Sequence, residues 1–371
     1  MAVLLPEPKL IHTDTELIVA EMASTWELTV GKTLYPAQPE SLFIRTIAYR
    51  ETLLRIAMNE AIKQNLVLFA TFPMLDHLAA FWGLERLPAA AARCTLSFTL
   101  TAIALSDTLI PSGTRVRSKD GLVIFATDAD LYISAGALNG ETTAVADIDG
   151  ILGNGYAAGD ISDLLDPIAN VLSVGNLDMT TAGADSEDDE HFRQRVLAAP
   201  ELLSVAGPAG YYIGLAKGAH VSIIDVAVWS TTDAVVHIAP LTDVGMPSQQ
   251  ILDLVDAVVN DRKVRPLTDH VIVQTPTEVQ YVINLKITLY SSADPTITRA
   301  GISSALDIYT ADRRAGLMRD VMDSQIIAAA QMSGVERVEL LDPTPSSLIL
   351  LSDEWANCTS ISISWEAPVN G

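Results

Sequence analysis

Cysteine is nearly absent from this sequence of 371 residues, which contains only Cys94 and Cys358. Two cysteines are too few for the disulfide framework of a small secreted domain, and no CxxC motif indicates a redox or zinc site. A single bridge between the two residues stays open as a minor alternative. The sequence therefore predicts a chain that folds in a reducing compartment.

Basic residues are also scarce: 23 lysines and arginines stand against 46 acidic residues, which gives a formal net charge of −23 at pH 7. Nucleic acids and anionic membranes are bound by clustered lysine and arginine, so neither is expected as the main partner. Charge of one sign favours solubility. An assembly of several such chains would need apolar or locally complementary contacts to overcome this repulsion.

Long apolar runs are missing as well. No stretch reaches the roughly 18 apolar residues that a membrane-spanning helix needs. The first ten residues, MAVLLPEPKL, lack the basic segment and apolar core of a secretory signal. The sequence is therefore expected to belong to a soluble protein without a membrane partner.

The sequence lacks the local motifs of common enzymes. Its six histidines are scattered without an HExxH pair, and no GxSxG elbow occurs. The glycines at 150, 153, 155 and 159 do not spell GxGxxG, and no GK[ST] follows them, so a phosphate cradle is not expected there. Only 6% of the residues are aromatic, which is few for sugar stacking. Carboxylate pairs for glycoside hydrolysis stay open, because they need not be close in sequence. We expect no catalytic residues, no cofactor and no metal.

The patterns that are present predict a multidomain α+β protein. Its four expected parts are an N-terminal helical arm (residues 1–92), a small all-β domain (93–178), a helical junction (179–220) and a C-terminal α+β domain (221–371). A length of 371 residues alone suggests two or three domains.

The arm is predicted to contain three helices. The first covers about 16–30 behind an Asp14 cap, the second about 40–68, and the third opens at Pro73. Its apolar surface either awaits a helix of another chain or forms an internal three-helix core, and the pattern favours neither. The candidate partner-binding residues on the second helix are Leu42, Phe43, Ile47, Leu54, Met58 and Ile62.

The β-rich part begins at Cys94, where the sequence turns to threonine, valine and isoleucine with many glycines. Lys119-Asp120-Gly121 predicts a hairpin turn between two strands. In the C-terminal part the strand with the clearest alternation is expected at 278–290, and the final strand at 361–365. Helices are expected near 294–310 and 320–332.

The densest charge cluster is GADSEDDEHFRQRVLAAP, residues 183–200. A metal site is one interpretation. Consecutive residues on a helix point about 100° apart, so the adjacent acids could not converge on one ion. The start of a helix fits better, with Ser186 as N-cap, Asp189 at the third position, and acids at the positive end of the helix dipole.

That helix would bury Phe192 and Val196, which stand at i,i+4, and would pair Arg193 with Asp189 or Glu190. Because the stretch lies between the β-rich part and the α+β part, it is interpreted as a junction. Gly183 and Gly207 flank it and are the hypothetical pivot positions. The candidate junction residues are Gly183, Ser186, Asp189, Phe192, Arg193 and Gly207.

These residues carry a resemblance that runs nearly from end to end. The chain resembles the baseplate assembly protein J family, the J-like wedge proteins of contractile-tailed phages and related injection machines. The matching segments are PESLFIRTIAYRETLLR (39–55), LDHLAAFWGLER (75–86), IPSGTRV (110–116), GNGYAAGDISDLLDPIANVLSVGN (153–176), the acidic stretch, SVAGPAGYYIGLA (204–216) and RPLTDHVIV (265–273).

The resemblance implies a structural subunit rather than an enzyme. Two copies are expected to associate with one smaller baseplate I-like protein, their arms bundling together. Six such wedges would ring the central hub, beside the sheath-initiating proteins, and the C-terminal α+β part would join copy to copy. The expected location is the tail baseplate of the virion, assembled in the host cytoplasm.

Two alternatives belong to other functional classes. One is a metal-assisted or carboxylate-dependent tail hydrolase that acts on a host envelope polymer. The other is a receptor-binding tail module, for which a trimeric β structure rather than a helical arm is expected.

Overall fold

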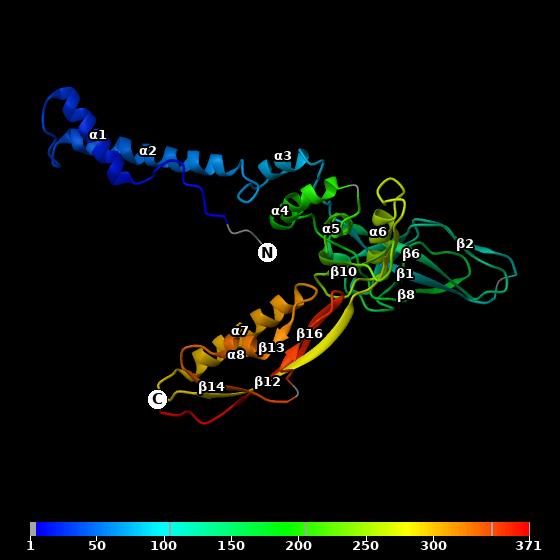
Figure 1. Cartoon of the computed structure of the whole chain (residues 1–371). Helices are drawn as coiled ribbons and strands as arrows, with labels where there is room; N and C mark the ends of the chain where they lie inside the picture. Colours follow the sequence, from blue (N-terminus) through cyan, green and yellow to red (C-terminus); the bar gives the residue numbers. More distant parts are fainter. Residues whose placement is uncertain (1–4, 104, 205, 343, 371) are drawn as a thin grey trace. The chain divides into compact units, whose positions relative to one another are not determined.

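The computed structural model describes residues 5–103, 105–204, 206–342 and 344–370. Residues 1–4 of the predicted arm, and residues 343 and 371 of the predicted C-terminal part, lie outside this range. The chain is a multidomain α+β protein that divides into two compact units. The first comprises Met1–Glu85 with Asp189–Leu197, and the second comprises Arg86–Asp188 with Ala198–Gly371. Figure 1 shows the elements along the chain.

The first unit is helical. It contains α1 (Thr15–Val30), α2 (Pro39–Lys63), α3 (Met74–Ala80) and nearly all of α4 (Asp189–Ala198). Local signals set its boundaries: the Asp14 side chain accepts hydrogen bonds from the amides of Glu16 and Leu17, and Gly31 ends α1 with a φ of 71°. Proline at the first position of α2 leaves no amide unsatisfied there.

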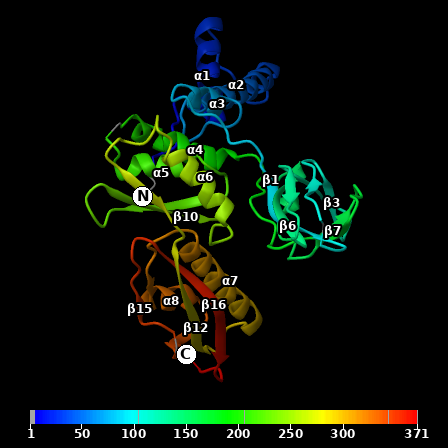
Figure 2. The same ribbon diagram turned by 90° about the vertical axis from the view of Figure 1, so that its right-hand side faces the viewer.

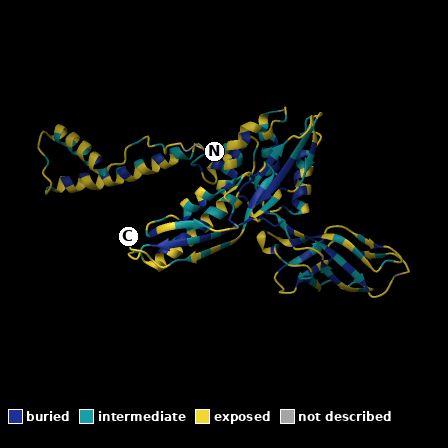
Figure 3. Cartoon of the chain, turned by 60° about the horizontal axis from the view of Figure 1, so that its bottom comes forward, coloured by how far each residue is buried: buried dark blue, intermediate teal, exposed yellow. Residues whose placement is uncertain are grey.

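The α1–α2 hairpin packs mainly through small side chains. Ile18 of α1 is fully buried, and the buried residues of α2 include Ser41, Ala48 and Thr52. The Thr52 hydroxyl donates to Thr15 at 3.2 Å, across the two helices. Most other residues of the hairpin are exposed, as Figure 3 shows. The hairpin therefore buries little of its own large apolar surface.

The second unit begins with a nearly closed sheet in the order β7-β3-β4-β6-β1-β8. Its strands are β1 (Ala91–Leu100), β3 (Arg115–Ser118), β4 (Ile124–Thr127), β6 (Asn139–Asp149), β7 (Ile161–Leu164) and β8 (Val171–Asn176), and a ribbon of β2 (Thr108–Ile110) and β5 (Leu131–Ile133) extends it. Strands β3 and β4 pair antiparallel around Asp120-Gly121, so the predicted hairpin is confirmed.

Alternating burial along β1 builds the core of this barrel-like sheet. Cys94, Leu96 and Phe98 point inward and are fully buried. The buried amide of Asn176 joins the two outer strands, because its oxygen accepts from Ile161 N at 2.9 Å and its nitrogen donates to Ala157 O at 2.9 Å. Both cysteines are free thiols, which excludes the bridge that the sequence left open.

A central section follows the barrel. Its sheet has the order β11-β10-β9, formed by β9 (Ile223–Trp229), β10 (Val235–Thr242) and β11 (His270–Val273). Helices α5 (Ala209–Lys217) and α6 (Gln249–Val259) pack their apolar residues against it, with Tyr212, Ile223, Ile238 and Val255 fully buried. The short turns η1 (Ile151–Gly153) and η2 (Ala199–Leu203) lie elsewhere in the second unit.

The last section is a second α/β layer pair. Its sheet has the order β14-β12-β16, from β12 (Thr277–Leu289), β14 (Val335–Leu340) and β16 (Glu354–Trp365). The helices α7 (Pro295–Arg314) and α8 (Asp323–Ala330) cover its apolar face, and a small ribbon joins β13 (Val321–Met322) to β15 (Ser347–Leu348). Figure 2 shows β12 and β16 side by side along their length.

Several boundaries differ from the sequence-based expectation. Helix α2 ends at Lys63 and not near 68, because the chain turns back on itself from Gln64 onward through hydrogen bonds such as Phe69 N to Leu66 O. Strand β16 starts at Glu354, well before the expected 361, because its first half pairs in parallel with β12. That half contains Trp355, Asn357 and Cys358, which do not alternate in polarity, so the pattern gave no strand signal.

Trp355 connects the central and last sections. Its side chain is 2% exposed and packs with Ala227, Ala239 and Leu241 of the central sheet. The indole nitrogen donates to Arg314 O at 2.8 Å, which satisfies its only donor. One side chain thus fills the boundary between two sheets.

We expect Trp355→Ala to lower the free energy of unfolding of the second unit by about 3–5 kcal/mol, because it leaves a cavity between the two sheets. Trp355→Phe is the matched control: it keeps most of the volume, loses one hydrogen bond and should cost about 1–2 kcal/mol. Urea denaturation measures both values. An alanine variant as stable as the phenylalanine variant would contradict this assignment.

Candidate functional site

The acidic stretch contains a helix that starts later than predicted. Helix α4 begins at Asp189, so Ser186 is not its N-cap and Asp189 is not at its third position. The reason is a contact distant in sequence: Glu187 N donates to Leu87 O at 3.1 Å, and Leu87 N donates to the Glu187 carboxylate at 2.9 Å. This pairing holds residue 187 outside any helix.

Glu187 is a structural carboxylate. It is 3% exposed, and Arg86 donates to its backbone carbonyl at 3.1 Å. Asp185 likewise accepts from the amide of Ile151 at 3.2 Å. Among the residues that the structure describes, no three histidines, cysteines or acids are grouped to hold a metal ion. Asp185 and Glu187 each accept a hydrogen bond from a backbone amide.

Arg193 connects α4 to the loop that follows α2 in the sequence through hydrogen bonds. Its guanidinium donates to Val67 O at 3.0 Å and to Ala70 O at 2.8 Å, and it also pairs with Glu190, as the sequence predicted. Asp189 accepts from the amide of Phe72 at 3.2 Å instead of pairing with Arg193. An arginine fork that satisfies two loop carbonyls fixes both position and orientation.

Phe192 and Val196 form the predicted buried stripe of α4. They are buried against Ala70, Leu75 and Ala79 of the region around α3. Sequence reasoning identified the stripe but not its partner, because the two segments lie more than one hundred residues apart. Helix α4 therefore packs with the helical unit, although its sequence lies between the barrel and the central section.

Removal of the Arg193 side chain should loosen this packing. We expect Arg193→Ala to cost about 2–3 kcal/mol in the first unit, because two loop carbonyls lose a charged donor. Gln194→Ala, on the exposed side of the same helix, should change stability by less than about 0.5 kcal/mol. Hydrogen exchange of the α3 amides measures both effects. Equal protection in the two variants would refute the fastening role.

The two hypothetical pivot glycines lie in close packing. Gly183 donates its amide to Asn154 at 2.8 Å, and a β-carbon there would meet Gly150 O at 2.5 Å. Gly207 has a φ of 68°, and a β-carbon would meet Asp269 and Pro266 at about 3 Å. Close contact explains both glycines without invoking motion. Their role as a pivot stays a prediction.

His220 connects the end of the barrel section to the central section. The side chain is 6% exposed; Ser222 N donates to Nδ1 at 3.2 Å, and Nε2 donates to Ala182 O at 3.1 Å. This network assigns the neutral imidazole with its proton on Nε2. Burial lowers the pKa of His220 below its usual 6.5, opposed by the Ala182 carbonyl and by Asp243.

The sign of the pH effect follows from this lowered pKa. The unfolded chain takes up a proton near pH 6.5 while the folded His220 stays neutral. Stability from this group is complete above pH 6.5 and is lost as pH falls toward the folded pKa. Urea midpoints should therefore drop more between pH 7.5 and 5.5 in the wild type than in His220→Asn. Parallel profiles for the two proteins would contradict this.

The arm presents large apolar side chains to solvent. At 100° per residue, Phe43, Ile47, Leu54 and Met58 fall within an arc of roughly 60° on α2. All four are exposed, Leu54 by 64% and Met58 by 52%. Of the other two predicted residues, Leu42 is exposed on a different side and Ile62 is half-buried.

Leu42 belongs to a second exposed stripe that sequence reasoning missed. Tyr49, Leu53 and Ile56 lie with it within an arc of roughly 60°. The two stripes and the buried side facing α1 are roughly 100–140° apart around α2. The missed signal was a helix that is apolar on more than one side, which indicates more than one helical neighbour.

A groove of about 540 Å³ lies between the two helices of the hairpin. Trp26 and Val30 of α1 line it together with Phe43 and Ile47 of α2, and Glu21 is the only charged residue in its lining. Apolar side chains on both walls suit an amphipathic helix laid between them. The groove continues the first exposed stripe.

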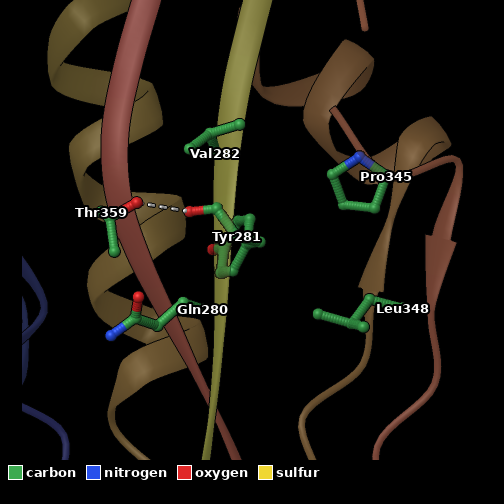
Figure 4. A pocket seen from close by; sticks show the side chains of 6 residues that line it. All are labelled: Gln280, Tyr281, Val282, Pro345, Leu348 and Thr359. Atoms are coloured by element: carbon green, nitrogen blue, oxygen red, sulfur yellow. Dashed lines mark hydrogen bonds between the residues drawn. The ribbon is translucent and has the colours of Figure 1, made fainter. Parts of the chain in front are cut away.

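A second hollow, of about 380 Å³, lies beside β12. Figure 4 shows its lining: Gln280, Tyr281, Val282, Pro345, Leu348 and Thr359, with the Thr359 hydroxyl donating to the Tyr281 carbonyl at 3.2 Å. None of these six side chains is a carboxylic acid, a histidine or a cysteine. The hollow thus lacks an acid–base pair in its lining.

Comparison with known proteins identifies the class. Four family models match in order along the chain: the baseplate J-like N-terminal domain (residues 38–92), barrel domain (95–183), central domain (204–275) and C-terminal domain (281–364). The matched segments cover most of the sequence. The chain belongs to the baseplate J-like family, as the resemblance predicted.

One relative is baseplate protein J of Escherichia phage P2, which is 36% identical over 176 residues. The match covers 47% of this chain and 57% of the phage protein, so the chain spans little more than half the length of that relative. The anti-feeding prophage baseplate, solved by electron cryomicroscopy with six-fold symmetry, contains a chain that is 13% identical. That match covers 92% of this chain and 89% of the other, with a TM-score of 0.40.

Within the described residues, no helix is both long and apolar enough to cross a membrane.

Proposed function

We propose that this chain is a structural subunit of the baseplate of a contractile phage tail or a related injection system. The observation that carries this proposal is the agreement of the four family models, in order, with an arm whose α2 exposes many large apolar side chains in the described part of the chain. In the proposed role the protein works by binding other baseplate proteins and not by catalysis. Its location is the tail baseplate of the virion, after assembly in the host cytoplasm.

The proposed unit of assembly is a wedge. Two copies of the chain bind one smaller I-like protein through their arms, and several wedges ring the central hub beside the sheath-initiating proteins. The two exposed stripes of α2 support this arrangement, since α1 covers one side of the helix and two sides are left for neighbouring helices. A bundle of helices from three chains would cover both sides.

The four-part division at residues 92, 178 and 220 is proposed as the functional plan of the wedge. In this plan the arm forms the bundle, and residues 221–371 supply contacts between copies. Asp189, Phe192 and Arg193 are the junction residues with contacts that support such a role, since they attach α4 beside α3. Coupling of triggering to sheath contraction would pass through this attachment.

The arm proposal is tested by co-expression with the I-like protein encoded nearby and by native mass measurement of the product. The wild type should give a complex of two copies with one partner. Leu54→Asp with Met58→Asp should abolish the complex, because two charges would be buried unpaired in the bundle. Both residues are exposed in the single chain, so its fold should persist.

Leu122→Asp is the matched control, because it makes the same change at an exposed site on the β3–β4 turn of the barrel. It should form the complex as the wild type does. A double arm variant that still binds, or a wild type that stays monomeric beside its partner, would overturn the proposal.

A further inference from the structure

Strand β16 leaves one long edge of its sheet open. In the order β14-β12-β16 it is the outermost strand, and no other strand within the described residues pairs with its far side. The opposite edge, β14, carries Glu336, Arg337 and Glu339. Charged side chains protect an edge strand from pairing with another chain, whereas β16 has no charged residue from 355 to 365.

The backbone groups that face outward on β16 can be assigned from its hydrogen bonds. Glu366 N donates to Ile287 O at 3.0 Å, so the amide of residue 366 points toward β12. Amide groups alternate between the two sides of a strand, so those of Ile361 and Ile363 point away from β12. These two residues therefore offer a row of donors and acceptors at the open edge.

The sequence of this edge is the same in both directions. Residues 360–364 read Ser-Ile-Ser-Ile-Ser, centred on Ser362. Ile361 and Ile363 pack on the helix-covered core and are half-buried, while Ser360, Ser362 and Ser364 are exposed on the other face. An antiparallel copy of the strand, rotated about Ser362, would place isoleucine beside isoleucine and serine beside serine.

The hydrogen-bonding pattern agrees with that register. Ser362 would face its own equivalent as a pair without hydrogen bonds. Ile361 would face Ile363 of the second copy and exchange both N–H···O bonds with it. The half-buried isoleucines would then meet across the junction and continue the apolar layer under the helices. Both the backbone and the side chains thus favour the same alignment.

We propose that β16 pairs with β16 of a second copy of this chain, antiparallel about Ser362, and joins two three-stranded sheets into one. The proposal adds a specific copy-to-copy contact to the proposed structural role, and rests on that role only in requiring that copies meet. The uncharged strand suits a chain of net charge −23, because it lets two copies approach where repulsion is lowest.

Disulfide trapping tests the register. Directly opposed residues without hydrogen bonds lie about 4.5 Å apart between Cα atoms, within the range that a disulfide spans. In a Cys358→Ser background, Ser362→Cys should oxidise to a disulfide-linked dimer of the full chain. Ser364→Cys is the matched control, since its equivalent would lie about 13 Å away along the strand, and it should stay monomeric.

Hydrogen exchange gives a second measurement that needs no disulfide. The amides of Ile361 and Ile363 should exchange more slowly as the concentration of the chain rises, and Ser362→Lys should abolish this slowing. Absence of the dimer together with absence of the slowing would overturn the proposal. Equal trapping at residue 364 would overturn the register and with it the pairing.

The arm provides the check against the proposed function. In a chain that also carries the Leu54→Asp and Met58→Asp changes, trapping at residue 362 should persist, because the edge does not depend on the arm. If the β16 edge does not pair, the Ser362→Cys dimer is absent while the complex with the I-like protein still forms. If the arm does not bind the I-like protein, that complex is absent while the Ser362→Cys dimer still forms. The two proposals therefore fail separately.

Discussion

The α1–α2 hairpin packs through small side chains, and this close packing leaves the large apolar side chains of α2 exposed. Ser41, Ala48 and Thr52 let the two helices approach closely, but they bury little apolar area. The large apolar side chains of α2 that remain exposed to solvent include Phe43, Ile47, Leu53, Leu54, Ile56 and Met58. Such a hairpin is only weakly stabilised by its own contacts, and helices of other chains would supply the missing burial.

The barrel, central and last sections each bury their apolar strand residues in a core of their own. The barrel core, the central layer and the last α/β layer each bury their alternating strand residues, and Trp355 fills the boundary between the last two. Among the described residues, β16 is an edge strand of the last sheet and has no charged side chain from 355 to 365. The chain thus combines three sections that have buried cores with a helical arm that exposes apolar side chains and a strand with an open edge. This combination suits a subunit that works by binding other proteins.

Local patterns predicted the elements well. Asp14, which was predicted to cap α1, accepts from amides two and three residues ahead, and the Asp120-Gly121 turn lies within its own hairpin. The family resemblance was likewise confirmed. What sequence reasoning missed depends on contacts between distant residues. Glu187 lies outside α4 because its carboxylate accepts from the amide of Leu87. Arg193 donates to a carbonyl of the loop that follows α2. Trp355 lies in β16 because that segment pairs in parallel with β12. No local pattern reports such partners.

The chain belongs to the baseplate J-like family, whose members are structural subunits of the baseplate. Electron cryomicroscopy of intact contractile particles from the source is the most direct test. The account predicts density for this chain in every wedge of the ring around the hub, with the apolar stripes of α2 covered by helices of neighbouring chains. Particles with complete baseplates that lack the chain, or that show its arm exposed to solvent, would contradict it.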